Sequence, residues 1–255
     1  MKYIASCSFG KDSIATILLA RENNETLDEI VYCEVMFDEN ISRELPEHRD
    51  FIYNIAIPKF ESWGYKVTIL KSKYTYMDVF FHIVENPRKH LDRKGKKSGF
   101  VMAGKCSVQR SCKLKPIEEY WKYHKDDVQY IGIAIDEPKR LERIANTKHK
   151  ISLLEKYNYT EEMAKQKCIE YGLLSPIYDF TSRGGCWFCP NARNGELRHL
   201  YENHKDLWQY LLNLEDVPNK VGNIWNTLTK TSIYNKDEQF QLEDAQMDIF
   251  NFIKE

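Results

Sequence analysis

The sequence predicts an α/β fold built on a parallel sheet, with a helical C-terminal segment. Short apolar runs rich in β-branched and aromatic residues alternate with stretches of helical spacing through much of the chain. Strands that alternate with helices pair in parallel and are joined by crossover connections. From Glu196 onward the chain is instead rich in Leu, Tyr and Trp at helical spacing, which predicts helices.

Each predicted element carries its own local signal. The first predicted strand begins at residue 3 and leads into a turn, and the others cover residues 29–37, 65–70 and 128–135. The predicted helices cover residues 14–20, 42–63, 115–124 and 159–172. Pro58 predicts a kink in the second helix, because proline lacks the amide hydrogen that the helical ladder needs. Thr160 is a good N-cap for the last of these helices, and Gly172 is a good stop. We expect a short extended segment around Pro176, over residues 173–180.

Composition narrows the class of protein. A chain of 255 residues can bury a sizeable core, and 37 Lys and Arg against 38 Asp and Glu neither favour nor exclude a nucleic-acid partner. No apolar run approaches the roughly 20 residues of a membrane span, and we expect no signal peptide before the first strand. Seven cysteines in such a chain indicate reduced thiols, and therefore metal or redox chemistry. We expect a cytoplasmic protein without a membrane partner.

A strand, a tight turn and a helix start follow one another at the N-terminus. Such a turn binds anions, because the first amide groups of the helix have no partner inside it and the helix dipole favours negative charge. Lys11 adds a full positive charge to the turn. The Walker pattern of two spaced glycines followed by Lys-Ser or Lys-Thr is absent, and an ordinary capped turn is the alternative. The predicted phosphate turn consists of Ser8, Phe9, Gly10, Lys11, Asp12 and Ser13.

Four of the cysteines have the spacing of metal ligands. Cys186 and Cys189 form a Cys-x2-Cys motif with two glycines before it and a proline after it, a common way to direct two thiolates at one metal. Cys106 and Cys112 complete a set of four if the fold brings the pairs together. Four sulfur ligands suit a 4Fe–4S cluster or a structural Zn²⁺, and spacing does not separate them. Four unrelated buried thiols are the remaining alternative.

A basic, glycine-containing stretch lies at residues 88–97. A solvated loop and a contact with phosphate or nucleic acid are both compatible with its composition. Its basic residues are Arg88, Lys89, His90, Arg93, Lys94, Lys96 and Lys97.

The predicted phosphate turn closely resembles the Ser-Gly-Gly-x-Asp-Ser signature of the PP-loop ATP pyrophosphatases, with Phe9 in place of the first glycine. Asp38 with Pro46 and Glu47 is similar to the Asp-Thr-Gly…Pro-Glu segment of the phosphoadenosine-phosphosulfate-reductase-like branch of that superfamily, although Thr-Gly is replaced. Residues 132–140 and 175–179 resemble later segments of that branch, the first without its early arginine. The resemblance covers about residues 3–190.

This resemblance implies a fold and a division of the chain. The expected core is an adenine nucleotide alpha hydrolase-like, Rossmann-like sheet over residues 1–185, and residues 186–255 hold the Cys-x2-Cys metal loop and the helical segment. The matching stretches follow successive predicted strands, and ligands of open α/β sheets bind at the carboxyl ends of the strands.

The resemblance also implies roles for single residues. The phosphate turn would hold the phosphates of ATP, with Lys11 and Asp12 in catalytic positions. Arg140 would offset the charge that builds as the bond to the α-phosphate breaks. Asp38 or Asp12 would position Mg²⁺, which prefers oxygen ligands. A solvated ion pair in a loop is the alternative for Asp38 and Arg140.

The function implied is transfer of AMP from ATP to an oxygen of an acceptor, with release of pyrophosphate, so that sulfur can replace the activated oxygen. Resemblance to cluster-bearing adenylylsulfate reductases and to DNA-sulfur-modification members favours a 4Fe–4S cluster over Zn²⁺. A nucleic acid as acceptor, a sulfur donor such as a cysteine desulfurase and a homodimer are compatible with the resemblance, but the sequence leaves the acceptor, the donor and the oligomeric state open. A sulfonucleotide reductase is the first alternative, but it needs a cysteine in a C-terminal tail and the last cysteine here is Cys189. A non-catalytic nucleotide-binding protein with structural zinc is the second.

Overall fold

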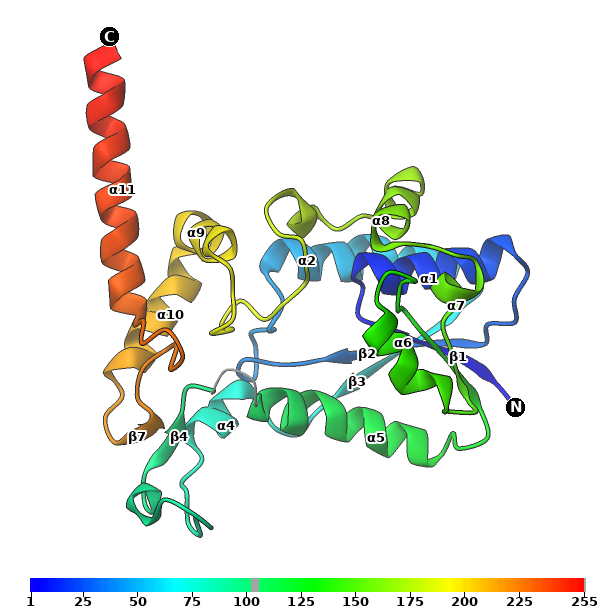
Figure 1. The fold of residues 1–255 in the computed structure, drawn as a ribbon, viewed down its shortest axis with the longest axis horizontal. Coiled ribbons are helices and arrows are strands. Elements are labelled where there is room, and N and C mark those ends of the chain that lie inside the picture. Colours follow the sequence, from blue (N-terminus) through cyan, green and yellow to red (C-terminus); the bar gives the residue numbers. More distant parts are fainter. Residues whose placement is uncertain (102–105, 255) are drawn as a thin grey trace. The chain divides into compact units, whose positions relative to one another are not determined.

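The computed structural model describes residues 1–101 and 106–254, which form two compact units that interleave along the chain (Figure 1). Unit 1 contains Met1–Val35, Glu44–Lys73 and Cys112–Gly184. Unit 2 contains Met36–Arg43, Tyr74–Ser111 and Gly185–Glu255, so it also takes two segments from the first half of the chain. The expected division into domains 1–185 and 186–255 stays a prediction.

Unit 1 is built on a five-stranded sheet in which all neighbours pair in parallel. The strand order is β3 (Lys66–Lys71), β2 (Glu29–Glu34), β1 (Tyr3–Cys7), β5 (Val128–Ile131) and β6 (Lys150–Ile151). The predicted parallel α/β core is therefore confirmed. β5 ends four residues earlier than the sequence predicts, and β6 is too short to be recognised from a pattern of alternating side chains.

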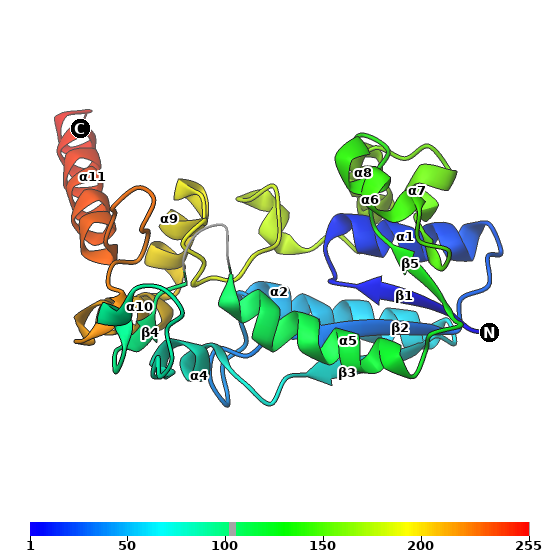
Figure 2. The same cartoon turned by 60° about the horizontal axis from the view of Figure 1, so that its bottom comes forward.

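Helices cover both faces of this sheet (Figures 1 and 2). α5 (Lys115–Lys122) lies on one face. The other face carries α1 (Lys11–Glu22), α2 (Pro46–Phe51), α3 (Ile57–Ser62), α7 (Leu153–Lys156) and α8 (Glu161–Glu170). α1 is central to the main core, because nine of its twelve residues are buried against the sheet and its neighbouring helices. Burial on this scale places the start of α1 firmly, which matters because the phosphate turn precedes it.

The predicted helix over residues 42–63 is present in three consecutive pieces. A π-helical turn at Ile52–Ala56 joins α2 to α3, and Pro58 lies in the first turn of α3. Proline removes a hydrogen-bond donor from the ladder, and a single π turn is a common way to accommodate such a break. The interruption that Pro58 predicts is therefore placed just before the proline.

The last residue of β2 is a fully buried carboxylate with three partners. Glu34 accepts hydrogen bonds from Arg49 at 3.1 Å and Tyr53 at 2.7 Å, and Lys71 lies 2.9 Å away. Burial by itself would raise the pKa of Glu34, but the hydrogen bonds from Lys71, Tyr53 and Arg49 lower it below the ordinary value. The charged form is therefore the one that the fold stabilises.

Between residues 159 and 180 the predicted helix is present, whereas the predicted extended segment is not. Thr160 caps α8 by accepting a hydrogen bond from the amide of Met163 at 3.2 Å, and Gly172 follows the helix with a φ of +65°. The prediction of an extended segment over residues 173–180 is wrong, because Pro176–Asp179 form a 3₁₀ turn capped by Ser175. Proline fixes its own φ in a range that suits the first position of such a turn.

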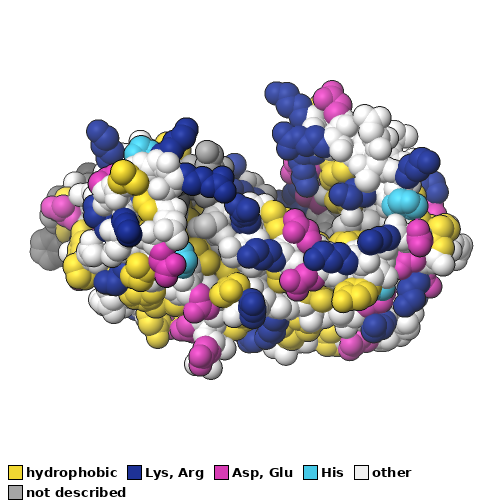
Figure 3. Space-filling model, turned by 90° about the horizontal axis from the view of Figure 1, so that it is seen from below, with side chains coloured by type: hydrophobic (Ala, Val, Ile, Leu, Met, Phe, Trp, Pro, Cys, Tyr) yellow, Lys and Arg dark blue, Asp and Glu magenta, His cyan; other side chains and the backbone are white. Residues whose placement is uncertain are grey.

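Unit 2 combines a two-stranded parallel sheet, β4 (Lys97–Gly99) with β7 (Lys220–Gly222), and helices. Its helices are α4 (Tyr76–Phe81), α9 (Asn194–Asn203), α10 (Lys205–Asp216) and α11 (Ile233–Lys254). The predicted helical C-terminal segment is confirmed. No helix among the described residues is both long and apolar enough to cross a membrane. Basic and acidic side chains are interspersed on the face shown in Figure 3.

Unit 1 also contains α6 (Pro138–Ala145), which starts from Glu137 shortly after β5. The connection from β5 to α6 and the turn from β1 to α1 both follow carboxyl ends of strands in the same parallel sheet. Residues of the two connections therefore meet at one edge of the sheet, which is the edge where open α/β sheets bind ligands.

Candidate functional site

The turn between β1 and α1 has the backbone of a glycine-containing turn although it begins with a phenylalanine. Phe9 has a φ of +57°, a left-handed conformation that costs a bulky residue about 1–2 kcal/mol. Its side chain is fully buried, with ring centroids 5.1 Å from Tyr32 and 6.1 Å from Phe60. Burial of an aromatic ring is worth more than this backbone cost, so the position keeps a glycine-like conformation without glycine.

Hydrogen bonds inside the turn fix the rest of its shape. The Ser13 hydroxyl donates to the carbonyl oxygen of Gly10 at 2.9 Å and accepts from the amide of Ser8 at 3.2 Å. The amide of Lys11 donates to the Tyr178 hydroxyl at 2.9 Å. Gly10 has no side chain that could cap α1, and a Cβ at this position would lie 3.1 Å from the Tyr178 oxygen. The Lys11 amide is thus bonded to Tyr178, whereas no side chain caps the following amide groups of Asp12 and Ser13, which are left for an external anion.

Lys11 is held at the start of α1 by two carboxylates. Its Nζ lies 2.8 Å from Asp12 Oδ1 and 2.6 Å from Glu161 Oε2, and its side chain is only 9% exposed. Burial by itself would lower the pKa of Lys11, but the hydrogen bonds to Asp12 and Glu161 raise it above the ordinary value. The ammonium group is therefore charged at neutral pH and fixed in place.

Negative charge exceeds positive charge around Asp12. Burial raises the pKa of Asp12, the hydrogen bond from Lys11 opposes this, and the charges of Glu161 and Glu137 raise it further. The Lys11 ammonium and the guanidinium of Arg140, which pairs with Glu137, thus face the three carboxylates of Asp12, Glu161 and Glu137. A site with this balance binds a phosphate chain best together with a divalent cation, because the cation offsets the carboxylates and coordinates phosphate oxygens.

A glycine allows two loops of unit 1 to touch at this place. A Cβ at Gly132 would lie 2.7 Å from the Asp12 carbonyl carbon and 2.8 Å from both the Asp12 oxygen and the Ser13 nitrogen. These atoms are backbone atoms and cannot move aside without moving the turn. Gly132 therefore sets the distance between the end of β5 and the start of α1.

Arg140 and Asp38 have well-defined local roles. Arg140 lies on α6 and pairs through Nη1 with Glu137, at 2.5 Å and 2.6 Å from its two carboxylate oxygens. Asp38 belongs to unit 2, where its Oδ1 accepts hydrogen bonds from the amides of Asn40 at 2.8 Å and Ile41 at 2.7 Å. Arg140 is thus in the same unit as the phosphate turn, and its predicted role and that of Asp38 stay predictions.

Two thiols of unit 1, those of Cys7 and Cys168, lie beside the phosphate turn and are unreactive at neutral pH. Burial raises the pKa of Cys7 to about 11, against a smaller opposing effect of its hydrogen bond to Ser13. Burial and the charge of Asp12 raise the pKa of Cys168 to about 12. Since the thiolate is the nucleophile, neither group is reactive at neutral pH. Cys33 is buried as well, so these three thiols are small residues of the core.

The Cys-x2-Cys loop is anchored by the two aromatic residues between its cysteines. Trp187 and Phe188 are both buried, and their ring centroids lie 4.6 Å and 5.4 Å from that of Phe37. The Trp187 indole nitrogen donates to the carbonyl of Ser42 at 2.9 Å, and the amide of Cys189 donates to the carbonyl of Cys186 at 3.0 Å. The core thus holds the middle of the loop, and both cysteines are half-buried at its ends.

Three of the four predicted ligands act electrostatically on one buried hydroxyl in unit 2. Tyr76 is fully buried, its ring centroid lies 4.2 Å from that of Phe188, and its hydroxyl has no hydrogen-bond partner among the described residues. Burial raises the pKa of Tyr76, and the charges of Cys106, Cys186 and Cys189 raise it further. A buried hydroxyl without a partner is costly, and a metal-bound thiolate next to it would supply an acceptor. The residues present therefore fit a metal centre.

Cys106 is exposed, and its Sγ accepts a hydrogen bond from the amide of Gln109 at 3.3 Å. Cys112 is buried and belongs to unit 1, where its carbonyl accepts from the Cys33 thiol at 3.7 Å. A shared centre of all four cysteines stays a prediction.

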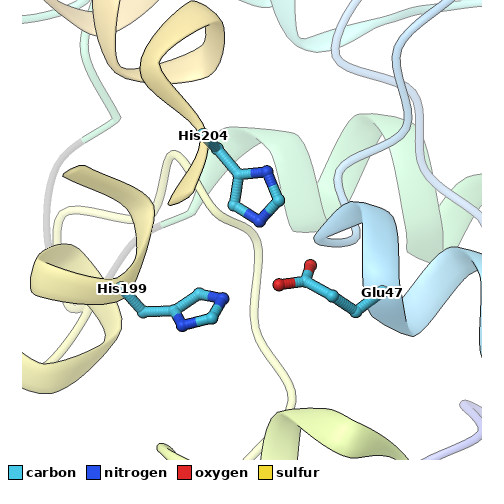
Figure 4. Close-up of side chains that lie close together, drawn as sticks. All are labelled: Glu47, His199 and His204. Carbon is cyan, nitrogen blue, oxygen red and sulfur yellow. The ribbon is translucent and has the colours of Figure 1, made fainter. Parts of the chain in front are cut away.

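Two histidines of unit 2 lie close together although their spacing in the sequence indicates no site. His199 lies on α9 and His204 precedes α10, and their ring centroids are 5.6 Å apart (Figure 4). Figure 4 also labels Glu47, which lies in the first turn of α2 in unit 1. An acidic side chain at that position stabilises the helix through its dipole.

Sequence reasoning missed three residues of the phosphate site. Glu161 reads as an ordinary acidic residue in the first turn of α8, Tyr178 as part of an extended segment, and Gly132 as a glycine inside the predicted strand over residues 128–135. Only Gly132 gives a usable signal, since a glycine in the interior of a predicted strand often marks a close backbone approach. The other two are 150 and 167 residues from Lys11 in the chain.

No protein-family model and no curated protein matches the chain. Among solved structures, the crystal structure of phosphoadenylyl-sulfate (PAPS) reductase from Candida auris, in complex with phosphate, is 13% identical with a TM-score of 0.44, over 73% of this chain and 82% of that one. The U34-tRNA thiolase NcsA from Methanococcus maripaludis, with its 4Fe-4S cluster, is 15% identical with a TM-score of 0.41, over 94% of this chain and 70% of that one. At such scores neither likeness bears on function.

Proposed function

We propose that the protein is an ATP pyrophosphatase that transfers AMP to an acceptor for sulfur insertion. The observation that carries this proposal is the charged, buried Lys11 at the uncapped start of α1, held by Asp12 and Glu161 beside a turn of fixed shape. A helix N-terminus with a rigid ammonium group binds a phosphate chain. The resemblance of residues 8–13 to the PP-loop signature specifies that the phosphate chain is that of ATP and that the bond broken is the one from the α-phosphorus to the bridging oxygen.

The reaction follows from this assignment. An oxygen of the acceptor attacks the α-phosphorus of ATP, the bond from that phosphorus to the bridging oxygen breaks, and pyrophosphate leaves with the electron pair. The acceptor then carries AMP on its oxygen. The terminal sulfur of a persulfide on a donor such as a cysteine desulfurase attacks the activated carbon, and AMP departs with the electron pair of the C–O bond. A thiol then attacks the donor's sulfur in the remaining S–S bond, which leaves the sulfur on the acceptor and the donor cysteine in a disulfide with that thiol.

The residues of this chain position and stabilise the groups that react. Lys11 and the first amide groups of α1 bind phosphate oxygens, and Arg140 offsets the charge that develops on the leaving pyrophosphate. Asp12 holds Mg²⁺ against the phosphates, with Asp38 as a further candidate ligand. Glu161 fixes the Lys11 ammonium group, so it acts through Lys11 and is a positioning residue.

We assign the metal centre to Cys106, Cys186 and Cys189, with Cys112 as the predicted fourth ligand. Four thiolates suit a 4Fe–4S cluster, and Zn²⁺ is the alternative. When bound, an iron–sulfur cluster would supply a site that holds and delivers sulfur, whereas zinc would be structural. The unpaired hydroxyl of Tyr76 beside three of these cysteines supports this assignment.

A sulfonucleotide reductase is a weaker candidate. Its chemistry needs an exposed thiol of low pKa that is not a metal ligand. The candidates outside the predicted metal set are Cys7, Cys33 and Cys168, and all three are buried. Burial raises the pKa of Cys7 and of Cys168 far above neutral pH. Sulfite release from an adenylylated sulfate should therefore be undetectable.

The test is pyrophosphate release from Mg-ATP by Lys11→Ala and Asp12→Ala variants. The acceptor is unidentified, so the assay uses the wild-type rate in the presence of hydroxylamine, a small nucleophile, as its reference. We expect both variants to lose at least about 10²-fold in rate, since each removes a group that acts on phosphate charge. Lys122→Ala is the matched control, because it removes an exposed lysine of the same unit. Unchanged rates in both variants would rule out the phosphate-turn assignment.

Anaerobic purification with an absorption spectrum and metal analysis tests the metal assignment separately. An iron–sulfur cluster absorbs broadly near 400 nm and zinc does not, so the spectrum separates the two metals. A protein without iron or zinc would refute the assignment while leaving the phosphate turn untouched. Zinc with no ATP turnover would instead support the alternative of a non-catalytic nucleotide-binding protein.

A further inference from the structure

We infer that unit 2 binds single-stranded nucleic acid at the basic stretch of residues 88–97. Phosphates of the strand contact the basic side chains at the rim of an adjacent hollow, and one base enters the hollow. This rests on the proposed function, because it names the class of acceptor. The hollow has a volume of about 500 Å³. Its wall includes Arg88, Lys89, His90 and Arg93, and Val84 and Pro87 are among its apolar lining residues.

Three cations at the rim have no side-chain partner among the described residues. No hydrogen bond or ion pair involves the side chains of Arg88, Lys89 or Arg93 in the part of the chain that the structure describes. Some other cations are paired, such as Arg198 with Glu202 in the same unit and Lys167 with Glu22 in unit 1. Unpaired like charges that are crowded together favour an external polyanion, which is the partner that relieves their repulsion.

Charge in this stretch is strongly one-sided. Between residues 85 and 97 six Lys and Arg side chains face two carboxylates, although the whole chain has a net charge of -1. The local excess therefore does not follow from composition. A single phosphate needs only two or three such groups, and a series of cations along a loop matches successive phosphates of a strand.

The loop presents its cations on an unusual backbone. His90 has a φ of +59°, and the short 3₁₀ turn Leu91–Arg93 follows it. The turn leaves Leu91 79% exposed between His90 and Asp92. An apolar side chain in such a position has no role in the core, but it can contact the face of a base.

The size of the hollow selects the form of nucleic acid. Pockets for small molecules have volumes of about 300–1,000 Å³, a range that includes one nucleoside and excludes a duplex. A base inside a duplex is stacked and paired, and its entry into a pocket requires that it leave the stack. The hollow therefore favours a single strand, a loop or a strand end over a regular duplex.

Fluorescence anisotropy of labelled oligonucleotides of about 20 nucleotides tests the inference. Single-stranded RNA, single-stranded DNA of the same sequence, and the DNA duplex are titrated with the full chain between about 50 and 200 mM salt. The variant is Arg88→Ala with Lys89→Ala, and the control is Lys122→Ala with Lys148→Ala, which makes the same change in charge at exposed positions of unit 1. Comparison of the affinities for single-stranded RNA and single-stranded DNA shows which of the two nucleic acids the protein prefers.

We expect the rim variant to bind the single strands about tenfold more weakly than the control at the lower salt concentration. Each phosphate contact contributes about 0.7 to the salt slope for single strands, so the slope should fall by about 1.4. Equal affinities of the rim variant and the control, or equal binding of duplex and single strand by the wild type, would overturn the inference. Displacement of the oligonucleotide by millimolar inorganic phosphate would also overturn it, because a simple phosphate site would then suffice.

A second pair of variants tests the hollow without changing charge. Val84 lines it, whereas the adjacent Ile83 is 44% exposed and does not. Val84→Phe should weaken binding of single strands and leave the salt slope unchanged, and Ile83→Phe should have no effect. Equal affinities of these two variants would show that no base enters.

ATP binding separates this inference from the proposed function. The rim variant should bind Mg-ATP as the wild type does in calorimetry, and Lys11→Ala should still bind the oligonucleotide. Loss of oligonucleotide binding in the rim variant alone supports the inference even if pyrophosphate release is never observed. A wild type that turns over ATP but binds no oligonucleotide would refute the inference and leave the proposed function standing.

Discussion

Gly132→Ala should disable the phosphate turn at a small cost in stability. The added Cβ would lie 2.7 Å from the Asp12 carbonyl carbon, about 0.7 Å short of an ordinary contact of 3.4 Å. The start of α1 must then shift by several tenths of an ångström. Overpacking of this kind costs about 1–3 kcal/mol, and in a domain of this size each kcal/mol lowers the melting temperature by about 2–4 °C. A misplacement approaching 1 Å reduces a rate by about 10²-fold.

Differential scanning calorimetry and pyrophosphate release measure the two effects on one preparation. We expect a melting temperature lower by several degrees and a rate lower by up to about 10²-fold. Gly184→Ala is the matched control, because a Cβ there meets Ile177 at an ordinary 3.7 Å. If Gly132→Ala matched the wild type in both measurements, the close approach of β5 to the phosphate turn would have no functional role. A loss of stability with full activity would refute the positioning argument alone.

Three further outcomes test the fold and the metal centre. Phe9→Gly should destabilise the protein by about 2 kcal/mol in urea unfolding. Loss of the buried ring costs about 3–5 kcal/mol, and relief of the left-handed backbone conformation returns about 1–2 kcal/mol. A variant more stable than the wild type would contradict this. The pKa of Glu34 is lowered by folding, so its stabilisation is complete above the ordinary pKa of 4.5 and is lost as pH falls through the lower folded pKa. Glu34→Gln should therefore lower the melting temperature at pH 7, with a difference from wild type that shrinks in acid; a constant difference would count against it. Tyr76→Phe should leave the metal-free protein as stable or more stable, because it removes a buried hydroxyl that has no partner among the described residues. The same variant should lose its metal to a chelator about tenfold faster or more. Equal rates of metal loss in the variant and the wild type would show that the hydroxyl does not contact a ligand.

The strands and the phosphate turn could be predicted from the sequence because their signals are local. The apolar run of β1, the small residues of the turn and the first turn of α1 are consecutive, and each restricts the backbone of its neighbours directly. The capped start of α8 at Thr160 and the interruption at Pro58 are local in the same sense. The alternation of such segments was enough to predict a parallel sheet, because crossover connections leave few other arrangements.

At two places the sequence indicated an unusual backbone but did not determine its conformation. Phe9 at a glycine position indicated an unusual conformation, and its φ of +57° with a fully buried ring shows how packing supports it. Residues 173–180 read as extended because proline disfavours a helix before it, yet the segment closes a 3₁₀ turn. That turn brings the Tyr178 hydroxyl to the amide of Lys11, a contact that no local pattern encodes.

Only the tertiary structure decided the electrostatics of the site and the division of the chain. Glu161 joins Lys11 across 150 residues, and Gly132 meets Asp12 through backbone atoms, so neither contact leaves a periodic trace in the sequence. In the same way, the charges of three cysteines of unit 2 act on Tyr76, whereas Cys112 belongs to unit 1. The composition of a segment determines its local conformation, but the partners of a buried charge or hydroxyl are set by long-range packing, because burial makes their interactions strong and only the complete fold determines what is buried.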